Sequence, residues 1–76
     1  PPKFVLKLYK NKVTLWDNEI TMEEVSVKAK EFINKAGKNA IVRVDAKSGI
    51  SEERISLLEE ELRKAGALNV NFREVK

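Results

Sequence analysis

Cysteine and histidine are both absent from the 76 residues of this chain. Without cysteine the chain has neither a disulfide framework nor a Cys-based metal site or nucleophile. Without histidine it lacks the commonest general base and metal ligand of proteins. The chain also has no serine-nucleophile elbow motif and no glycine-rich phosphate loop. We therefore expect no catalytic residues, no metal site and no cofactor, and we interpret the protein as a non-enzyme.

Long apolar runs and a strong excess of one charge are missing too. No run approaches the roughly 20 apolar residues that a membrane helix needs, and no signal peptide is recognisable. The 15 basic and 12 acidic residues are interleaved and leave a net charge of +3. Because the chain begins with Pro1, we expect it to be an excised piece of a longer protein. Glutamine is absent as well, which fits a thermophilic protein or a designed sequence.

Apolar residues alternate with polar ones in four segments, which predicts four strands at residues 4–9, 13–16, 40–44 and 68–73. The polar stretch at residues 10–12 and the dipeptide Asp17-Asn18 predict turns between them.

Two further segments have helical spacing. Thr21 and Glu24 form a capping-box pattern that predicts the start of the first helix, and Gly37 predicts its end. Ser51 is the expected N-cap of the second helix, and Gly66 its stop. The expected buried stripe comprises Val25, Ala29, Phe32, Ile33 and Ala36 in the first helix, and Ile55, Leu58, Leu62 and Ala65 in the second.

The order of the elements is therefore ββαβαβ within a single domain spanning residues 1–76. A helix between the last two strands permits a parallel crossover. We predict an α+β fold, a two-layer α/β sandwich with both helices on one face of a mixed sheet.

Two acidic patterns are candidates for catalytic chemistry. Asp17 and Asp45 could form a carboxylate pair, but turns and strand ends are the ordinary places for aspartate. The glutamates of the second helix are typical of a solvated face with i,i+4 ion pairs, such as Glu59 with Arg63.

The sheet face directed away from the helices is the first candidate binding surface. It is expected to carry Val5, Tyr9, Trp16, Ile41 and Arg43, and tryptophan and tyrosine are common anchors of protein interfaces. Scattered aromatic residues on an open sheet face are the competing interpretation. An unpaired edge strand is a second candidate surface, because it offers free backbone groups to a partner peptide.

Residues 41–72 contain an apolar strand ending in Arg43-Val44-Asp45, a short loop at 46–50, a long helix ending in Ala65-Gly66, and a final apolar strand. This succession resembles the periplasmic domain of the ExbD/TolR family. Residues 13–21 are similar to the front half of that domain. Ser51 departs from the family, which often has an aromatic residue there, and the single membrane helix of the family is absent from this sequence.

The resemblance implies a function without bond chemistry. ExbD/TolR proteins are stators of a proton-driven inner-membrane motor, with an ExbB/TolQ-like partner and a TonB- or TolA-like transducer. Their periplasmic domain docks and dimerises, and TolR-type members contact peptidoglycan. We therefore expect a periplasmic docking module of an inner-membrane-anchored protein, forming a homodimer and binding the transducer by strand addition or at the open sheet face.

Two other interpretations stay open. A de novo designed α/β protein without biological function would explain the regular caps and glycine stops, although Val25, Ser26 and Val27 are weak helix formers. A small nucleic-acid-binding domain is the third alternative. We do not expect nucleic acid as a partner, because paired strand aromatics and a GXXG clamp are both missing.

Overall fold

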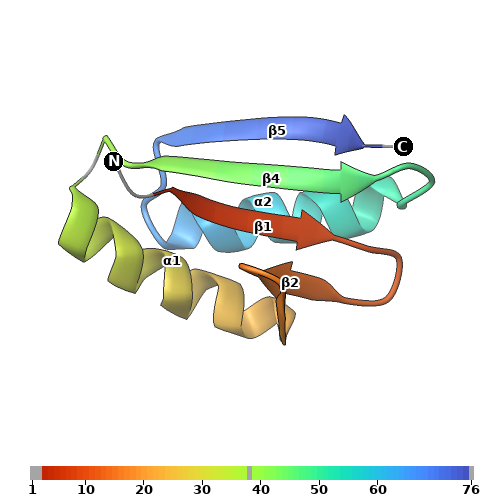
Figure 1. The fold of residues 1–76 in the computed structure, drawn as a ribbon, viewed down its shortest axis with the longest axis horizontal. Coiled ribbons are helices and arrows are strands. Elements are labelled where there is room, and N and C mark those ends of the chain that lie inside the picture. The colour runs from red at the N-terminus through yellow and green to blue at the C-terminus, as the bar shows by residue number, and fades with distance from the viewer. Residues whose placement is uncertain (1–2, 38, 76) are drawn as a thin grey trace.

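The computed structural model describes residues 3–37 and 39–75, which form two helices and a five-stranded sheet (Figure 1). The elements in chain order are β1 (Phe4–Leu8), β2 (Val13–Leu15), β3 (Asn18–Ile20), α1 (Met22–Ala36), β4 (Ile41–Lys47), α2 (Glu52–Lys64) and β5 (Asn69–Val75). The strands lie in the order β3-β2-β1-β4-β5. The β1–β2 and β2–β3 pairs are antiparallel, whereas β1–β4 and β4–β5 are parallel. The predicted α+β class with a mixed sheet is confirmed.

One hydrophobic core joins both helices to the same face of the sheet, and Figure 1 shows α2 passing behind β4 and β1. Alternate residues of β1 and β4 are completely or almost completely buried, as strand geometry requires when one face is covered. Fully burying a valine, leucine or phenylalanine side chain contributes about 1.5–3 kcal/mol to the free energy of unfolding. The core side chains on these elements are Phe4, Leu6, Leu8, Val42, Val44, Ala46, Val25, Ala29, Ile33, Leu58 and Leu62.

Both helices begin as the sequence predicts. The Thr21 hydroxyl accepts a hydrogen bond from the Glu24 amide at 3.2 Å, and the Glu24 carboxylate accepts one from the Thr21 amide at 3.0 Å. Ser51 caps α2 by accepting from the Arg54 amide. Arg54 then donates to the carbonyls of Tyr9 and Lys12, so α2 is tied to the turn after β1. The positive φ of 96° at Gly37 explains why a glycine ends α1.

The hairpin between β2 and β3 corrects the predicted element order. The expected turn at Asp17-Asn18 is wrong: Leu15 pairs with Asn18, so the two loop residues are Trp16 and Asp17. Residues 18–20 form the additional strand β3, and the observed order is βββαβαβ. The sequence did not indicate this strand, because a bulky residue such as tryptophan seldom adopts the positive φ that a two-residue hairpin loop demands.

The C-terminal half contains longer strands than the alternation indicated. β4 runs to Lys47 and takes in part of the expected loop at 46–50, and β5 runs from Asn69 to Val75. β4 and β5 pair in parallel over seven residues, from Ile41 opposite Asn69 to Lys47 opposite Val75. This pairing extends both strands beyond the predicted segments. Ala36, which was expected in the buried stripe of α1, is exposed at the end of that helix.

Neither described helix has the length and apolar character needed to cross a membrane.

Candidate protein-interaction surfaces

The open sheet face brings together three of the five residues predicted to bind a partner. Val5 of β1 lies opposite Arg43 of β4, and Ile41 precedes Arg43 on the same face of β4. Tyr9 follows the end of β1, where the ammonium groups of Lys12 and Lys47 lie 4.9 and 5.9 Å from the centre of its ring. Val5, Ile41 and Arg43 therefore form one small group, and Tyr9 lies apart from it among lysines.

Ion pairs occupy much of the same face. The Asp45 carboxylate accepts hydrogen bonds from the Nε atoms of Arg43 and Arg73, each at 3.2 Å. Burial acts to raise the pKa of Asp45, but the two arginines outweigh it and hold the pKa below its ordinary value. Lys7 binds Asp17 at 2.9 Å, which raises the pKa of Lys7. Asp17 and Asp45 thus each pair with cations, and this geometry favours structural roles over a catalytic carboxylate pair.

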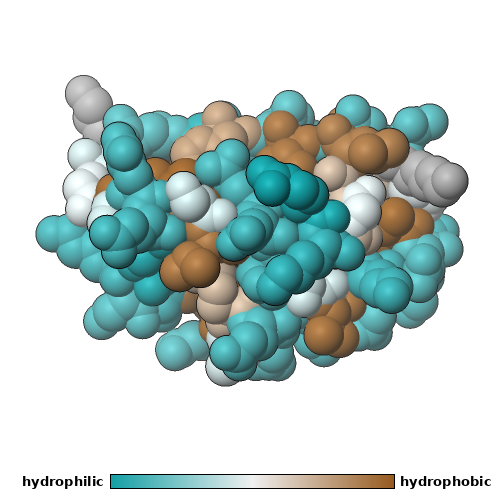
Figure 2. Space-filling model, turned by 180° about the vertical axis from the view of Figure 1, so that it is seen from behind, coloured by the Kyte–Doolittle hydropathy of each residue, from teal (hydrophilic) through white to brown (hydrophobic). Residues whose placement is uncertain are grey.

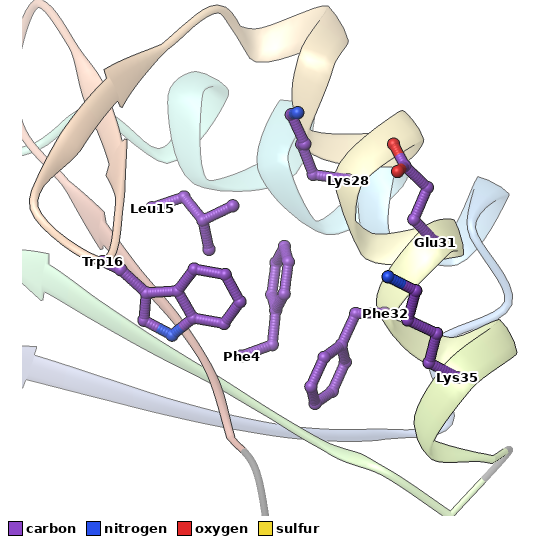
Figure 3. Close-up of a pocket in the computed structure, with 7 residues that line it drawn as sticks. All are labelled: Phe4, Leu15, Trp16, Lys28, Glu31, Phe32 and Lys35. Atoms are coloured by element: carbon purple, nitrogen blue, oxygen red, sulfur yellow. The ribbon is translucent and has the colours of Figure 1, made fainter.

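Trp16 does not lie on the open face, where the sequence placed it. Figure 3 shows its ring beside Phe4 and Phe32, next to α1. The Phe4 and Trp16 rings meet edge to face with centres 5.8 Å apart, and Phe4 and Phe32 are 5.3 Å apart. The prediction failed because strand alternation ends at Leu15, and the turn redirects the next side chain.

The backbone at this turn is strained. Trp16 and Asp17 have φ values of 48° and 68°, in the left-handed region that favours glycine and asparagine. A residue in a sparsely populated backbone region costs of the order of 1–3 kcal/mol. Two hydrogen bonds hold the residue in place: the Trp16 amide donates to the Val5 carbonyl at 3.2 Å, and the indole N–H donates to the Lys3 carbonyl at 3.0 Å.

The outer edge of β5 is the second surface. β5 is an edge strand of seven residues, and its backbone pairs only with β4 within the described sheet. The side chains of Val70 and Phe72 lie on the helix side but remain 36% and 41% exposed. Leu68, just before the strand, is also exposed. Figure 2 shows hydrophobic side chains gathered along this upper edge of the molecule. We call the strand and these three side chains the β5 edge.

The other edge of the sheet is built differently. β3 has three residues, of which Asn18 and Glu19 are exposed, and the chain turns at once into α1 through the Thr21 cap. Short edge strands with charged residues are a common protection against unwanted pairing. β5 contains Arg73 and Glu74 but no proline. Of the two edges, β5 therefore offers the longer and more apolar template for another strand.

Sequence reasoning named an edge strand as a candidate but could not identify it. The alternation of Leu68, Val70 and Phe72 with polar residues predicted a strand with one buried side. The helix layer covers that side only in part, and the alternation pattern carries no signal for this. The strand order of the structure identifies the edge strand, because β5 comes last in the sheet.

Comparison with protein-family models and with curated proteins gives no match for this chain.

Proposed function

We propose that this protein is a docking and dimerisation module that binds by adding a strand to the β5 edge. One observation carries the proposal: a seven-residue edge strand displays half-exposed Val70 and Phe72 beside unpaired backbone. Long, apolar edge strands readily pair with another chain, because both backbone hydrogen bonds and apolar contacts are gained. Such binding needs no catalytic residue.

The first partner we propose is a second copy of the chain, because the β5 edge can complement itself. In an antiparallel pair centred on Asn71, Val70 of one copy lies opposite Phe72 of the other, twice by symmetry. On the other face Asn69 lies opposite Arg73, so no like charges meet. A register centred on Arg73 would instead place two arginines opposite each other, which is unfavourable.

The resemblance to the ExbD/TolR family supports a more specific form of the proposal. In that form the module is the periplasmic part of a proton-driven stator anchored in the inner membrane by an ExbB/TolQ-like partner. An extended segment of a TonB- or TolA-like transducer would then use the same β5 edge. The arrangement of β4, α2 and β5 as one parallel unit agrees with the strand, loop, helix and strand on which the resemblance rests.

Sedimentation equilibrium tests the docking proposal with two matched variants. Val70→Lys places a charge in the β5 edge, whereas Val27→Lys places the same charge at an exposed valine of α1. We expect the native chain and Val27→Lys to dimerise with equal affinity and Val70→Lys to be monomeric. Equal self-association of all three proteins, or a native chain that stays monomeric at millimolar concentration, would contradict the proposal.

The stator form has a separate test, which is the gene sequence upstream of the Pro1 codon. We expect it to encode one apolar helix of about 20 residues with a single aspartate. An upstream sequence without such a helix would contradict the stator form and leave the docking proposal standing.

A further inference from the structure

A second site lies near the opposite edge of the sheet, between the β2–β3 turn and α1. A pocket of about 230 Å³ opens there, lined by Phe4, Leu15, Trp16, Lys28, Glu31, Phe32 and Lys35 (Figure 3). We call it the Trp16 pocket. None of its lining residues belongs to β4 or β5, so the pocket is independent of the β5 edge.

Aromatic rings form the floor of this pocket. Phe4 is buried beneath Trp16 and Phe32, and Trp16 is 53% exposed although its ring contacts Phe4. Its indole N–H is bonded to the Lys3 carbonyl, and the exposed part of the residue can contact a partner. Keeping a half-exposed tryptophan at a φ of 48° favours a role for the side chain over a role in the turn itself.

Charged side chains of α1 line the rim of the pocket. Lys28, Glu31 and Lys35 come from the same side of the helix and leave the rim with an excess of one positive charge. Neither lysine makes an ion pair with a described residue. The rim therefore favours a ligand that carries an anionic group next to the part that contacts the aromatic rings.

The size of the pocket decides the class of ligand. Sites for small molecules usually enclose about 300–1,000 Å³ and cover most of the ligand, whereas this pocket is smaller and open to solvent. It has room for one aromatic side chain, and such side chains are the usual anchors of protein interfaces.

We propose that the Trp16 pocket binds a single aromatic side chain of a partner peptide, with one flanking acidic residue paired with Lys28 and the other with Lys35. The aromatic ring contacts Trp16 and Phe32. Recognition is thus specific for an aromatic residue flanked by Asp or Glu.

Trp16 is the only tryptophan of the chain, so its fluorescence reports on the pocket directly. The probe is a capped pentapeptide with one phenylalanine between two glutamates. Two control peptides replace the phenylalanine by alanine or the glutamates by lysine. We expect a saturable fluorescence change with the first peptide, and weaker binding of both controls. Three outcomes would overturn the proposal: no saturation up to 10 mM peptide, equal binding of the alanine peptide, or tighter binding of the lysine peptide.

Variants of α1 separate the proposed contact from general electrostatics. Lys28→Gln and Lys35→Gln should each weaken the binding of the glutamate peptide about two- to fivefold, as expected for one exposed ion pair. Lys30→Gln removes the same charge from an exposed position of α1 outside the pocket and should leave the affinity unchanged. A similar loss in all three variants would overturn the assignment of the two lysines. If 3-phenylpropionate bound as tightly as the peptide, the pocket would be a small-molecule site, and the peptide proposal would be wrong.

Val70→Lys should bind the glutamate peptide like the native chain. This variant distinguishes failure at the Trp16 pocket from failure of the proposed docking function.

Discussion

Leu57 and Leu58 are neighbours on α2 with opposite environments, and truncating each to alanine gives a sharp test of how this helix packs. Leu58 is completely buried, whereas the Leu57 side chain is 50% exposed. Both substitutions replace leucine by alanine in the middle of the same helix, so the change in helix propensity is the same. The difference between the two variants therefore reports burial alone.

The magnitudes follow from these environments. Leu58→Ala removes three carbons from the core, worth about 0.8 kcal/mol each, which gives about 2.4 kcal/mol before any cavity is counted. The cavity term brings the expected loss of unfolding free energy to about 3–4 kcal/mol. Leu57→Ala should cost about 1 kcal/mol or less, because half of its side chain is already in water. A 76-residue domain is stable by roughly 4–11 kcal/mol, so the first loss is severe and the second is small.

Urea denaturation followed by circular dichroism measures both losses. The slope of free energy against urea should stay the same in the two variants, with only the midpoint shifted. Equal losses, or a loss under about 0.5 kcal/mol for Leu58→Ala, the range of surface substitutions, would refute the assigned face of α2.

Two further predictions concern the cap of α1 and the charge network of the open face. Thr21→Ala removes one half of the capping box and should lower the unfolding free energy by about 1 kcal/mol in urea denaturation, whereas Thr21→Ser should retain it. A loss equal in both variants would contradict the role of the hydroxyl. The pKa of Asp45 is lowered in the folded state, so its contribution is present above its ordinary value of 3.8 and is lost as the pH falls through the lower folded value. Thermal unfolding between pH 6 and 2 should show a smaller acid-induced loss of stability for Asp45→Asn than for the native chain. Identical profiles in the two proteins would show that the contacts of Asp45 with Arg43 and Arg73 do not cause the acid-induced loss.

Local signals explain why most of the fold could be predicted from the sequence. Thr21 and Glu24 lie at capping-box spacing, and the structure forms both of the reciprocal bonds that this spacing predicts. Val42 and Val44 are buried and Ile41 is exposed, as two-residue alternation predicts. These features depend on residues close in the chain.

The β2–β3 hairpin could not be predicted, because its turn goes against local preference. Trp16 and Asp17 both adopt positive φ, whereas hairpin loops of this length favour Asn-Gly. The adjacent Asp17-Asn18 pair looks more like a turn. That one-residue difference conceals the short strand β3 and moves Trp16 from the open face to the wall of the pocket.

The β5 edge could not be located from the sequence, because its exposure depends on tertiary packing. Val70 and Phe72 alternate like the core residues Val42 and Val44, yet they remain exposed because β5 lies at the edge of the sheet. How far the helix layer extends over a strand depends on the packing of the whole domain. The sequence could name an edge strand as a candidate but could not identify β5.

Amide hydrogen exchange at two protein concentrations tests pairing at the β5 edge most directly. At micromolar concentration the outward amides of residues 69–75 should exchange rapidly, because no strand covers them. At millimolar concentration the same amides should become protected as a second copy pairs with them, while the amides of β3 stay unchanged. Exchange at β5 that is independent of concentration, or protection that appears on β3 instead, would contradict the proposed docking surface.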